Sequence, residues 1–221
     1  MQELDHVSHW VFDLDNTLYP PSARLFDLIE VRMTDWVMQE LGVARDEADR
    51  LRAQYWRSYG TTLSGLMREH GVDPTPYLTH VHDIPLSALE PDAALAAAIR
   101  ALPGRKIVYT NGSRQHAERV TEARGLGGLF DAMYGIEDAG FLPKPERGAF
   151  DAVFRAAGVE PTRAAMFEDD ARNLAVPHDM GMACIHVHPD RHEAPHVHHH
   201  APDLGAFLSQ LTGRDDTAPR P

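Results

Sequence analysis

Short apolar runs alternate with amphipathic stretches along most of this chain. Five runs are brief enough to form buried strands, and they fall at residues 9–13, 106–110, 133–136, 164–167 and 183–187. Apolar residues at helical spacing predict helices over 91–102, 113–124, 145–157, 171–180 and 203–211. Strands that alternate with helices in this way indicate a parallel sheet covered on both faces. The expected fold class is therefore α/β.

The segment between the first two expected strands has a different pattern. From Ser22 to about residue 82, apolar residues recur at helical spacing and no strand pattern is found. Gly42, Gly60 and Gly71 stand where helices of this segment would end. We therefore expect a helical cap, residues 21–87, inserted into an α/β core formed by residues 1–20 and 88–212. Residues 213–221 are polar and contain proline, which predicts a disordered tail.

Composition and charge exclude several classes of function. The chain has 221 residues, of which 43% are hydrophobic, and its formal net charge is -12. This charge argues against nucleic acid as a partner and against attachment to an anionic membrane. The single cysteine, Cys184, excludes an intramolecular disulfide bond. With no signal-peptide pattern and no apolar run near the ~20 residues of a membrane span, we expect a cytoplasmic monomer or homodimer.

Two carboxylates stand at the end of the first expected strand. Asp13 and Asp15 follow the apolar residues of that strand, and Asn16 and Thr17 come next. Carboxylates beside a buried strand are costly unless a cation compensates their charge, and oxygen-rich sites favour magnesium. The alternative is a polar turn, which accounts for Asn16. That alternative does not explain why polar clusters also follow the later strands.

The second and third polar clusters could compensate an anion. Thr110, Asn111, Gly112 and Ser113 lie between an expected strand and a helix, where free N–H groups bind anions. A helix cap by Ser113 is the alternative. Lys144 lies between two prolines, which favour an extended backbone. It is either a solvated surface lysine or a fixed positive charge near the carboxylates.

The fourth cluster is acidic and follows the fourth expected strand. Glu168, Asp169 and Asp170 are consecutive, and Asn173 follows three residues later. Acidic residues favour a helix N-terminus, but this preference accounts for one or two of them rather than three. Together the clusters supply what phosphoryl transfer through a carboxylate requires: a nucleophile, an acid for the leaving oxygen, and compensation for the phosphate charge.

These motifs resemble those of the haloacid dehalogenase-like (HAD) phosphohydrolases. The resemblance covers nearly all of the chain except the tail, and its motifs are Phe12-Asp13-Leu14-Asp15-Asn16-Thr17, Thr110-Asn111-Gly112, Lys144-Pro145, and Glu168-Asp169-Asp170 with Asn173. It implies a Rossmann-like core of five parallel strands in the order 5-4-1-2-3, with an inserted all-helical cap. It also implies a phosphatase that uses Mg²⁺ and an aspartyl-phosphate intermediate.

The resemblance implies a role for each motif residue. Asp13 would be the nucleophile and Asp15 the general acid/base, and Lys144 would stabilise the phosphate and orient Asp13. Asp13, the backbone carbonyl of Asp15, and Asp169 would hold the magnesium ion. Asp170 would then be a helix cap or a residue behind the metal ligands. An acid at position 15 implies a phosphate ester, since a leaving alkoxide needs a proton and a halide does not.

The resemblance also suggests a substrate. Thr110 would bind the phosphate, with Asn111 beside it. The motifs look most like those of pyrimidine 5′-nucleotidases, which implies small phosphorylated substrates of the nucleoside monophosphate class. A sugar phosphate or another small metabolite is the alternative, and a non-catalytic binding protein is a third possibility. Residues suggested for contacts with the leaving group are Tyr19, Arg24, Arg57 and Tyr59.

A histidine-rich stretch precedes the last expected helix. Seven histidines fall between His186 and His200. A transition-metal site is one interpretation, but the spacing matches no zinc motif of fixed geometry. We therefore favour a loop that leads into the last helix.

Overall fold

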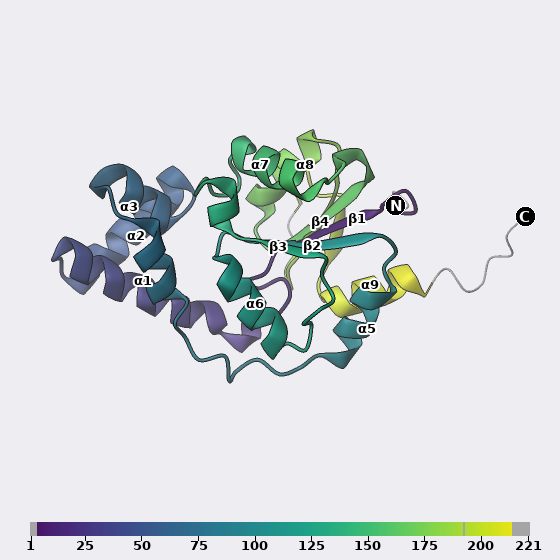
Figure 1. The fold of residues 1–221 in the computed structure, drawn as a ribbon, viewed down its shortest axis with the longest axis horizontal. Helices are drawn as coiled ribbons and strands as arrows, with labels where there is room; N and C mark the ends of the chain where they lie inside the picture. Colours follow the sequence, from purple (N-terminus) through teal and green to yellow (C-terminus); the bar gives the residue numbers. More distant parts are fainter. Residues whose placement is uncertain (1–3, 192, 214–221) are drawn as a thin grey trace, which may run out of the picture.

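The computed structural model describes residues 4–191 and 193–213, and these residues contain a six-stranded sheet (Figure 1). The strands are β1 (His9–Phe12), β2 (Arg105–Tyr109), β3 (Ala132–Tyr134), β4 (Ala164–Glu168), β5 (Ala183–Val187) and β6 (His199–Ala201). Their order is β3-β2-β1-β4-β5-β6, and every neighbouring pair is parallel. The expected α/β class is confirmed.

The sheet has one strand more than the five-stranded core predicted from the sequence. The expected strands are adjacent in the order 5-4-1-2-3, and β6 extends the sheet beyond β5. In β6, His199 pairs with Ile185, and Ala201 pairs with Val187. The loop prediction was wrong here because β6 consists of two histidines and an alanine. These residues lack the apolar alternation that identifies a strand.

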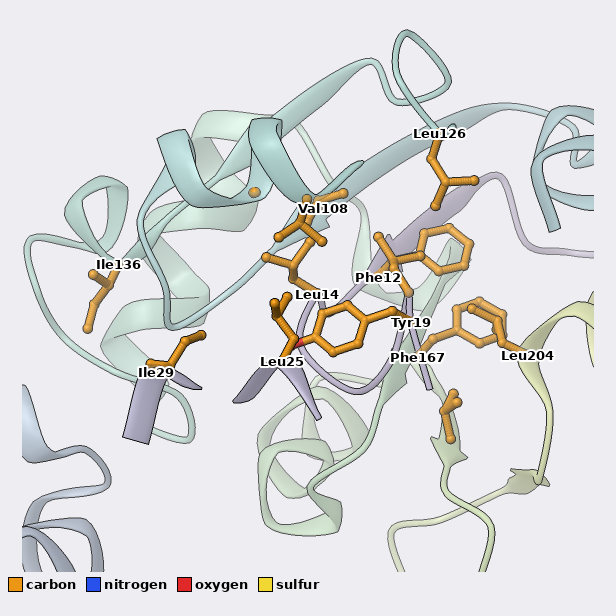
Figure 2. Packing of buried hydrophobic residues seen from close by; sticks show 14 of the residues in the cluster. Phe12, Leu14, Tyr19, Leu25, Ile29, Val108, Leu126, Ile136, Phe167 and Leu204 are labelled. Carbon is orange, nitrogen blue, oxygen red and sulfur yellow. The ribbon is translucent and has the colours of Figure 1, made fainter. Parts of the chain in front are cut away.

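Helices cover both faces of the sheet (Figure 1). They are α5 (Ala93–Ala101), α6 (Arg114–Ala123), α7 (Arg147–Ala157), α8 (Ala175–Asp179) and α9 (Leu204–Thr212). Successive strand residues point to opposite faces, so Val11 belongs to the cluster under α7 and Phe12 to the cluster on the other face. Phe12 stacks on Phe167 with ring centroids 4.7 Å apart, and Figure 2 shows both rings in that cluster.

Four further helices follow β1 and lie together beyond one edge of the core (Figure 1). They are α1 (Leu25–Leu41), α2 (Arg45–Tyr59), α3 (Thr62–His70) and α4 (Pro74–Val81). Gly42 and Gly71 end α1 and α3 with φ angles of 64° and 66°, a conformation that glycine adopts without strain. Thr61 and Asp73 cap the N-termini of α3 and α4 with their side chains.

Some boundaries differ from the sequence-based expectation or stay predictions. The helical pattern was expected from Ser22, but the first α-helix of the inserted segment begins at Leu25, because Pro21–Ala23 forms the short 3₁₀ helix η1. The division into a cap, residues 21–87, and a core stays a prediction. Apart from Gly213, the tail predicted to be disordered lies outside the described residues. Within the described part of the chain, no helix is long and apolar enough to cross a membrane.

Candidate active site

The carboxyl ends of the central strands bring the predicted polar clusters together. β1 pairs with both β2 and β4, and Phe12 lies opposite Phe167 in that register. Asp13 directly follows β1, and its backbone N–H donates to the Phe167 carbonyl at 2.9 Å. Thr110 directly follows β2, and Glu168 is the last residue of β4. Parallel strands with this register place their terminal polar residues at one edge of the sheet.

Lys144 reaches the same point from the loop before α7. Its side chain is 1% exposed, and its Nζ donates to Asp13 Oδ1 and to Glu168 Oε2 at 2.6 Å each. A third hydrogen bond, 3.1 Å long, goes to the Tyr109 carbonyl. Burial alone would lower the pKa of Lys144, but the two carboxylates outweigh burial and raise it. A charged ammonium therefore bridges the two acids and fixes the orientation of Asp13.

Asn111 supports the loop that carries Lys144. The Lys144 backbone N–H donates to Asn111 Oδ1 at 2.8 Å, and Asn111 Nδ2 donates to the Lys144 carbonyl at 3.2 Å. The Lys144–Pro145 peptide bond is cis. Both ends of the amide are thus engaged by the lysine's own backbone. The predicted contact between Asn111 and the phosphate stays a prediction.

Three carboxylates form the group that could hold a cation. Asp13, Glu168 and Asp169 each offer an oxygen, and these oxygens lie within 4.8 Å of one another. Glu168 was missed among the predicted ligands because the resemblance assigned the metal-binding role of the acidic cluster to Asp169. The available signal was its position as the last residue of a buried strand. Asn173 Nδ2 donates to Glu168 Oε1 at 3.2 Å, so the following helical turn supports this acid.

Burial and mutual repulsion raise the pKa values of this acidic group. The pKa of Asp13 rises to about 8, first through burial and then through the charge of Glu168. Burial raises the pKa of Glu168 to about 7, and Lys144 offsets only part of this effect. The pKa of Asp169 also rises to about 7, through burial and the charge of Asp13. One ammonium does not balance three neighbouring carboxylates, two of them buried, so the donor set fits a cation.

Asp15 has different hydrogen-bond partners from those of Asp13. The Tyr19 hydroxyl donates to Asp15 Oδ1 at 2.7 Å, and His116 Nε2 lies 3.2 Å from the same oxygen. Burial opposes ionisation of Asp15, but His116 and Tyr19 hold the pKa of this carboxyl below its usual value. The two acids of the first motif therefore have opposite pKa shifts, because burial and neighbouring carboxylates raise the pKa of Asp13 while His116 and Tyr19 stabilise the ionised form of Asp15.

The remaining predicted residues occupy turns at strand ends. Thr110 is buried, and its Oγ1 accepts a hydrogen bond from the Gly112 N–H at 2.9 Å. Ser113 caps the N-terminus of α6, as the alternative interpretation of that cluster predicted. Asp170 caps the 3₁₀ helix η4 (Ala171–Leu174) by accepting from the Arg172 N–H at 3.0 Å. Asp170 is therefore a helix cap, one of the two roles left open for it.

A cavity of about 570 Å³ connects these residues with α1 to α4. The strand ends and their loops contribute Asp13, Asp15, Thr110, Asn111, Lys144, Glu168 and Asp169 to its lining. The helices contribute the apolar residues Phe26, Ile29, Met33, Leu63, Leu78 and Val81, with Arg52, Trp56, Thr62 and Tyr77. The Arg172 guanidinium lies 3.8 Å from the centroid of the Trp56 ring, so the fourth motif also contacts α2.

The four residues suggested for leaving-group contacts do not line this cavity; they are Tyr19, Arg24, Arg57 and Tyr59. Tyr19 instead bonds to Asp15, and Arg24 pairs with Asp27 at the surface. Tyr59 donates to Glu69. The suggestion rested on residue type, which alone does not tell which side chains point into a cavity.

A comparison with protein families shows which family this arrangement of residues belongs to. A family model described as haloacid dehalogenase-like hydrolase matches residues 8–181, a span that contains every motif of the site. The chain belongs to the haloacid dehalogenase-like hydrolase family. The predicted membership in this family is thereby confirmed. The match does not extend to the pyrimidine 5′-nucleotidase subgroup.

Two curated relatives of this HAD-like hydrolase are similar in sequence. Phosphate metabolism protein 8 of Saccharomyces cerevisiae is 31% identical over 197 residues, which cover 81% of this chain and 61% of the yeast protein. Enolase-phosphatase E1 of a Bradyrhizobium species is 25% identical over 125 residues, which cover 57% of this chain and 51% of that protein. The chain thus spans between half and two thirds of the length of these relatives.

Solved structures of other HAD proteins share the fold. A HAD phosphatase from Thermococcus onnurineus superposes with a TM-score of 0.62 at 16% identity, covering 94% of this chain and 98% of the other. The L-2-haloacid dehalogenase of Xanthobacter autotrophicus gives a TM-score of 0.58 at 16% identity, covering 94% and 99%. At such identities the similarity establishes the HAD-like fold and leaves the reaction to the site residues.

Side chains of the histidine-rich stretch contact backbone carbonyls of the fourth motif and of the residue that follows Asp170. His186 Nε2 lies 2.8 Å from the Asp169 carbonyl, and His196 Nε2 lies 2.8 Å from the Ala171 carbonyl. Among residues 4–191 and 193–213, these histidines form no group of three or more with ligand atoms close enough to hold a metal ion. In the described part of the stretch, His186, His196 and His200 contact backbone carbonyls. These contacts differ from the zinc coordination that was considered from the sequence.

Proposed function

We propose that this HAD-like hydrolase is a magnesium-dependent phosphomonoesterase that works through an aspartyl-phosphate intermediate. One observation carries the proposal: buried Asp13, held by Lys144, lines the same cavity as a second acid, Asp15. A carboxylate nucleophile alone would serve both a dehalogenase and a phosphatase. The second acid favours a phosphate ester, because a leaving ester oxygen needs a proton and a halide does not.

The proposed reaction has two halves. Lys144 holds Asp13 Oδ1, which leaves Oδ2 to attack phosphorus. As the Asp13–phosphorus bond forms, the bond from phosphorus to the leaving oxygen breaks, and this oxygen takes a proton from Asp15. A water molecule then attacks phosphorus and gives a proton to Asp15, the Asp13–phosphorus bond breaks, and inorganic phosphate leaves. Lys144, Thr110 and the N–H groups before α6 compensate the charge on the phosphate oxygens.

The acidic group fits a resident Mg²⁺ ion. Asp13, Glu168 and Asp169, with the Asp15 backbone carbonyl, would hold it. Their oxygens are the donors that magnesium prefers, and the raised pKa values of the three carboxyls support a compensating cation. When bound, the ion supplies positive charge beside the phosphate oxygens. Glu168 therefore joins the ligand set that was predicted without it.

Removing magnesium should make the folded protein less stable as the pH rises. The pKa values of Asp13, Glu168 and Asp169 are about 8, 7 and 7 in the metal-free fold, against ordinary values of 3.8, 4.5 and 3.8. The folded state therefore binds more protons than the unfolded state between about pH 4 and about pH 8, so the free energy of unfolding falls across this interval. Urea unfolding with EDTA, at about pH 5.5 and about pH 8, measures the fall.

Added magnesium should reduce this fall, because the ion replaces the protons and binds only the folded site. Asp169→Asn should make the metal-free profile less steep, since it removes one of the titrating carboxyls. Asp131→Asn, the same change at a residue outside the cavity, serves as the control. Identical profiles with and without magnesium would contradict the assignment of the metal to this acidic group.

We further propose nucleoside monophosphates as the substrates, with pyrimidine nucleotides preferred. The cavity joins an acidic, phosphate-compatible end to apolar walls, as a nucleoside leaving group requires. Trp56 is 48% exposed and offers an aromatic face, and Tyr77, which also lines the cavity, offers a hydroxyl group for a hydrogen bond with the base. The similarity of the motifs to those of pyrimidine 5′-nucleotidases supports the same class. A sugar phosphate would leave much of the apolar wall without a contact.

A panel of phosphate esters assayed with magnesium tests both proposals. We expect kcat/KM for pyrimidine nucleoside monophosphates to exceed that for hexose phosphates by at least about tenfold. Trp56→Ala should raise KM for nucleotides and leave kcat within about threefold, because the contact is made equally in the ground and transition states. Val31→Ala, an exposed apolar residue of α1 outside the cavity, is the control.

The outcomes separate the three candidate functions. Equal efficiency on sugar phosphates and nucleotides would contradict the nucleotidase assignment and keep the phosphatase. Absence of magnesium-dependent turnover on every ester would contradict the phosphatase and favour a non-catalytic binding protein.

A further inference from the structure

The general acid/base Asp15 receives both of its side-chain hydrogen bonds on one oxygen. The Tyr19 hydroxyl and His116 Nε2 lie 2.7 Å and 3.2 Å from Oδ1. Among the described residues, no hydrogen-bond donor reaches the other oxygen, Oδ2. Asp15 lines the cavity, so the unoccupied oxygen is the one available to the substrate. The carboxylate is therefore oriented, with one oxygen anchored and one left for proton transfer.

The surroundings of His116 determine which ring nitrogen faces Asp15 as a donor. The His116 side chain is fully buried, and its Nδ1 has no hydrogen-bond partner among the described residues. A buried N–H without an acceptor is costly, so the proton belongs on Nε2. In this tautomer His116 donates to Asp15 Oδ1. Because the two residues are 101 positions apart in the sequence, this contact anchors the first motif to α6.

The His116 ring is in turn held by a histidine from the segment that leaves α4. The rings of His82 and His116 stack with centroids 4.3 Å apart and an angle of 12° between their planes. His82 Nδ1 lies 3.0 Å from Ser113 Oγ, and the Arg119 guanidinium donates to the His82 carbonyl at 2.7 Å. The position of the His116 ring therefore depends on both α6 and the chain that returns from the helices α1 to α4.

We propose that His116 is a positioning residue for Asp15, and that His82 clamps its ring. The inference rests on the proposed function, in which Asp15 is the acid/base. With Oδ1 anchored, Oδ2 carries the proton to the leaving oxygen as the bond from that oxygen to phosphorus breaks. Oδ2 then receives a proton from the water whose oxygen bonds to phosphorus. Without the His116 contact only the Tyr19 hydroxyl holds Oδ1, so the carboxylate is less restrained and these two proton transfers slow down.

The leaving group distinguishes positioning from a general structural effect. An alkoxide leaving from a nucleoside monophosphate needs the proton, whereas p-nitrophenolate leaves without one. His116→Phe keeps a ring against His82 and removes the donor to Asp15. Rapid mixing of this variant with p-nitrophenyl phosphate should give a burst of p-nitrophenolate at nearly the wild-type rate. Steady-state turnover should then fall by about 10²-fold, because hydrolysis of the aspartyl phosphate still needs Asp15.

With a nucleoside monophosphate the same variant should show no burst, and its first turnover should slow by about 10²-fold. His116→Gln places an amide N–H near the position of Nε2 and should restore most of the rate. His116→Asn has the same amide on a shorter chain and should not restore it. This matched pair decides the question even if His116→Phe does not fold. Glu118→Gln, on the exposed face of α6, is the control.

Each result bears on a different statement. Equal slowing of the burst and of the nucleotide reaction in His116→Phe, or equal rates for the Gln and Asn variants, would overturn the positioning role alone. His82→Ala should show the same selective loss to a smaller extent, and a uniform loss on both esters would overturn the clamp. Absence of turnover by the wild-type protein with magnesium would overturn the proposed function and this inference together.

Discussion

Replacing Asp13 by Asn should abolish phosphate release and leave the fold intact. Asparagine keeps the shape of the side chain, and its carbonyl oxygen can still accept the hydrogen bond from Lys144. It is no nucleophile for phosphorus, so we expect kcat to fall by at least about 10⁴-fold. The change also removes a buried carboxyl whose pKa is raised to about 8, so the free energy of unfolding near pH 8 should stay constant or increase.

Phosphate release and urea unfolding measure these two expectations. Because Asp13 is also a proposed metal ligand, loss of activity alone does not identify the nucleophile. Acid quenching of the wild-type protein with radiolabelled substrate should place the label on the peptide that contains Asp13. Asp5→Asn, the same change at an exposed turn, should leave turnover unaltered. A labelled wild-type peptide that lacks Asp13, or an active Asp13→Asn protein, would refute the proposed mechanism.

The sequence predicts the central architecture because local patterns determine it. The strands β1 to β5 are apolar runs, and helices of the inserted segment end at glycines such as Gly42 and Gly71 with left-handed φ angles. β6 could not be predicted in this way. Its pairing with β5 depends on backbone hydrogen bonds, and its histidines carry no apolar signal for a strand.

The predicted site residues converge because parallel strands end at a common edge of the sheet. Asp13, Thr110 and Asp169 follow three strands that are neighbours in space, so their motifs predicted their proximity. Lys144 was a weaker signal, since a single lysine is ordinarily solvated. In the folded protein its buried ammonium pairs with Asp13 and Glu168, which are 131 and 24 positions away in the sequence. The spacing of these residues in the sequence does not reveal that they are in contact.

The residues that the sequence did not reveal act through tertiary contacts. Glu168 belongs to an acidic run that is typical of a helix N-terminus. Only its place at the end of a buried strand makes it a candidate ligand. His116 occupies an ordinary position on an amphipathic helix, and only the fold brings it to Asp15. Arg52 and Trp56 line the cavity because α2 packs with one particular face toward it, which depends on its neighbours α1 and α3. Their identification needed the packed structure.

Replacing Lys144 by Met should destabilise the protein in a pH-dependent way. Methionine has a similar length but no charge, so Asp13 and Glu168 lose the ammonium that bridges them at 2.6 Å. Breaking a buried ion pair of this kind costs about 3–5 kcal/mol in the free energy of unfolding. Asp13 and Glu168 can take up protons at about pH 5.5 but less so at about pH 8, so the loss should be greater at the higher pH.

Urea unfolding of metal-free protein at the two pH values measures this difference in lost stability. Two further variants test whether the lost charge causes it. Lys144→Met combined with Glu168→Gln leaves only one unpaired carboxylate in contact with the position of the ammonium, so part of the stability should return without activity. Lys106→Met is the matched control, because in the described part of the chain the Lys106 ammonium donates to the carbonyls of Leu102 and Gly104 and to no carboxylate. Its loss should be small and should not change with pH. An equal loss at both pH values for Lys144→Met would mean that the packing of the lysine, rather than its charge, holds Asp13 in position.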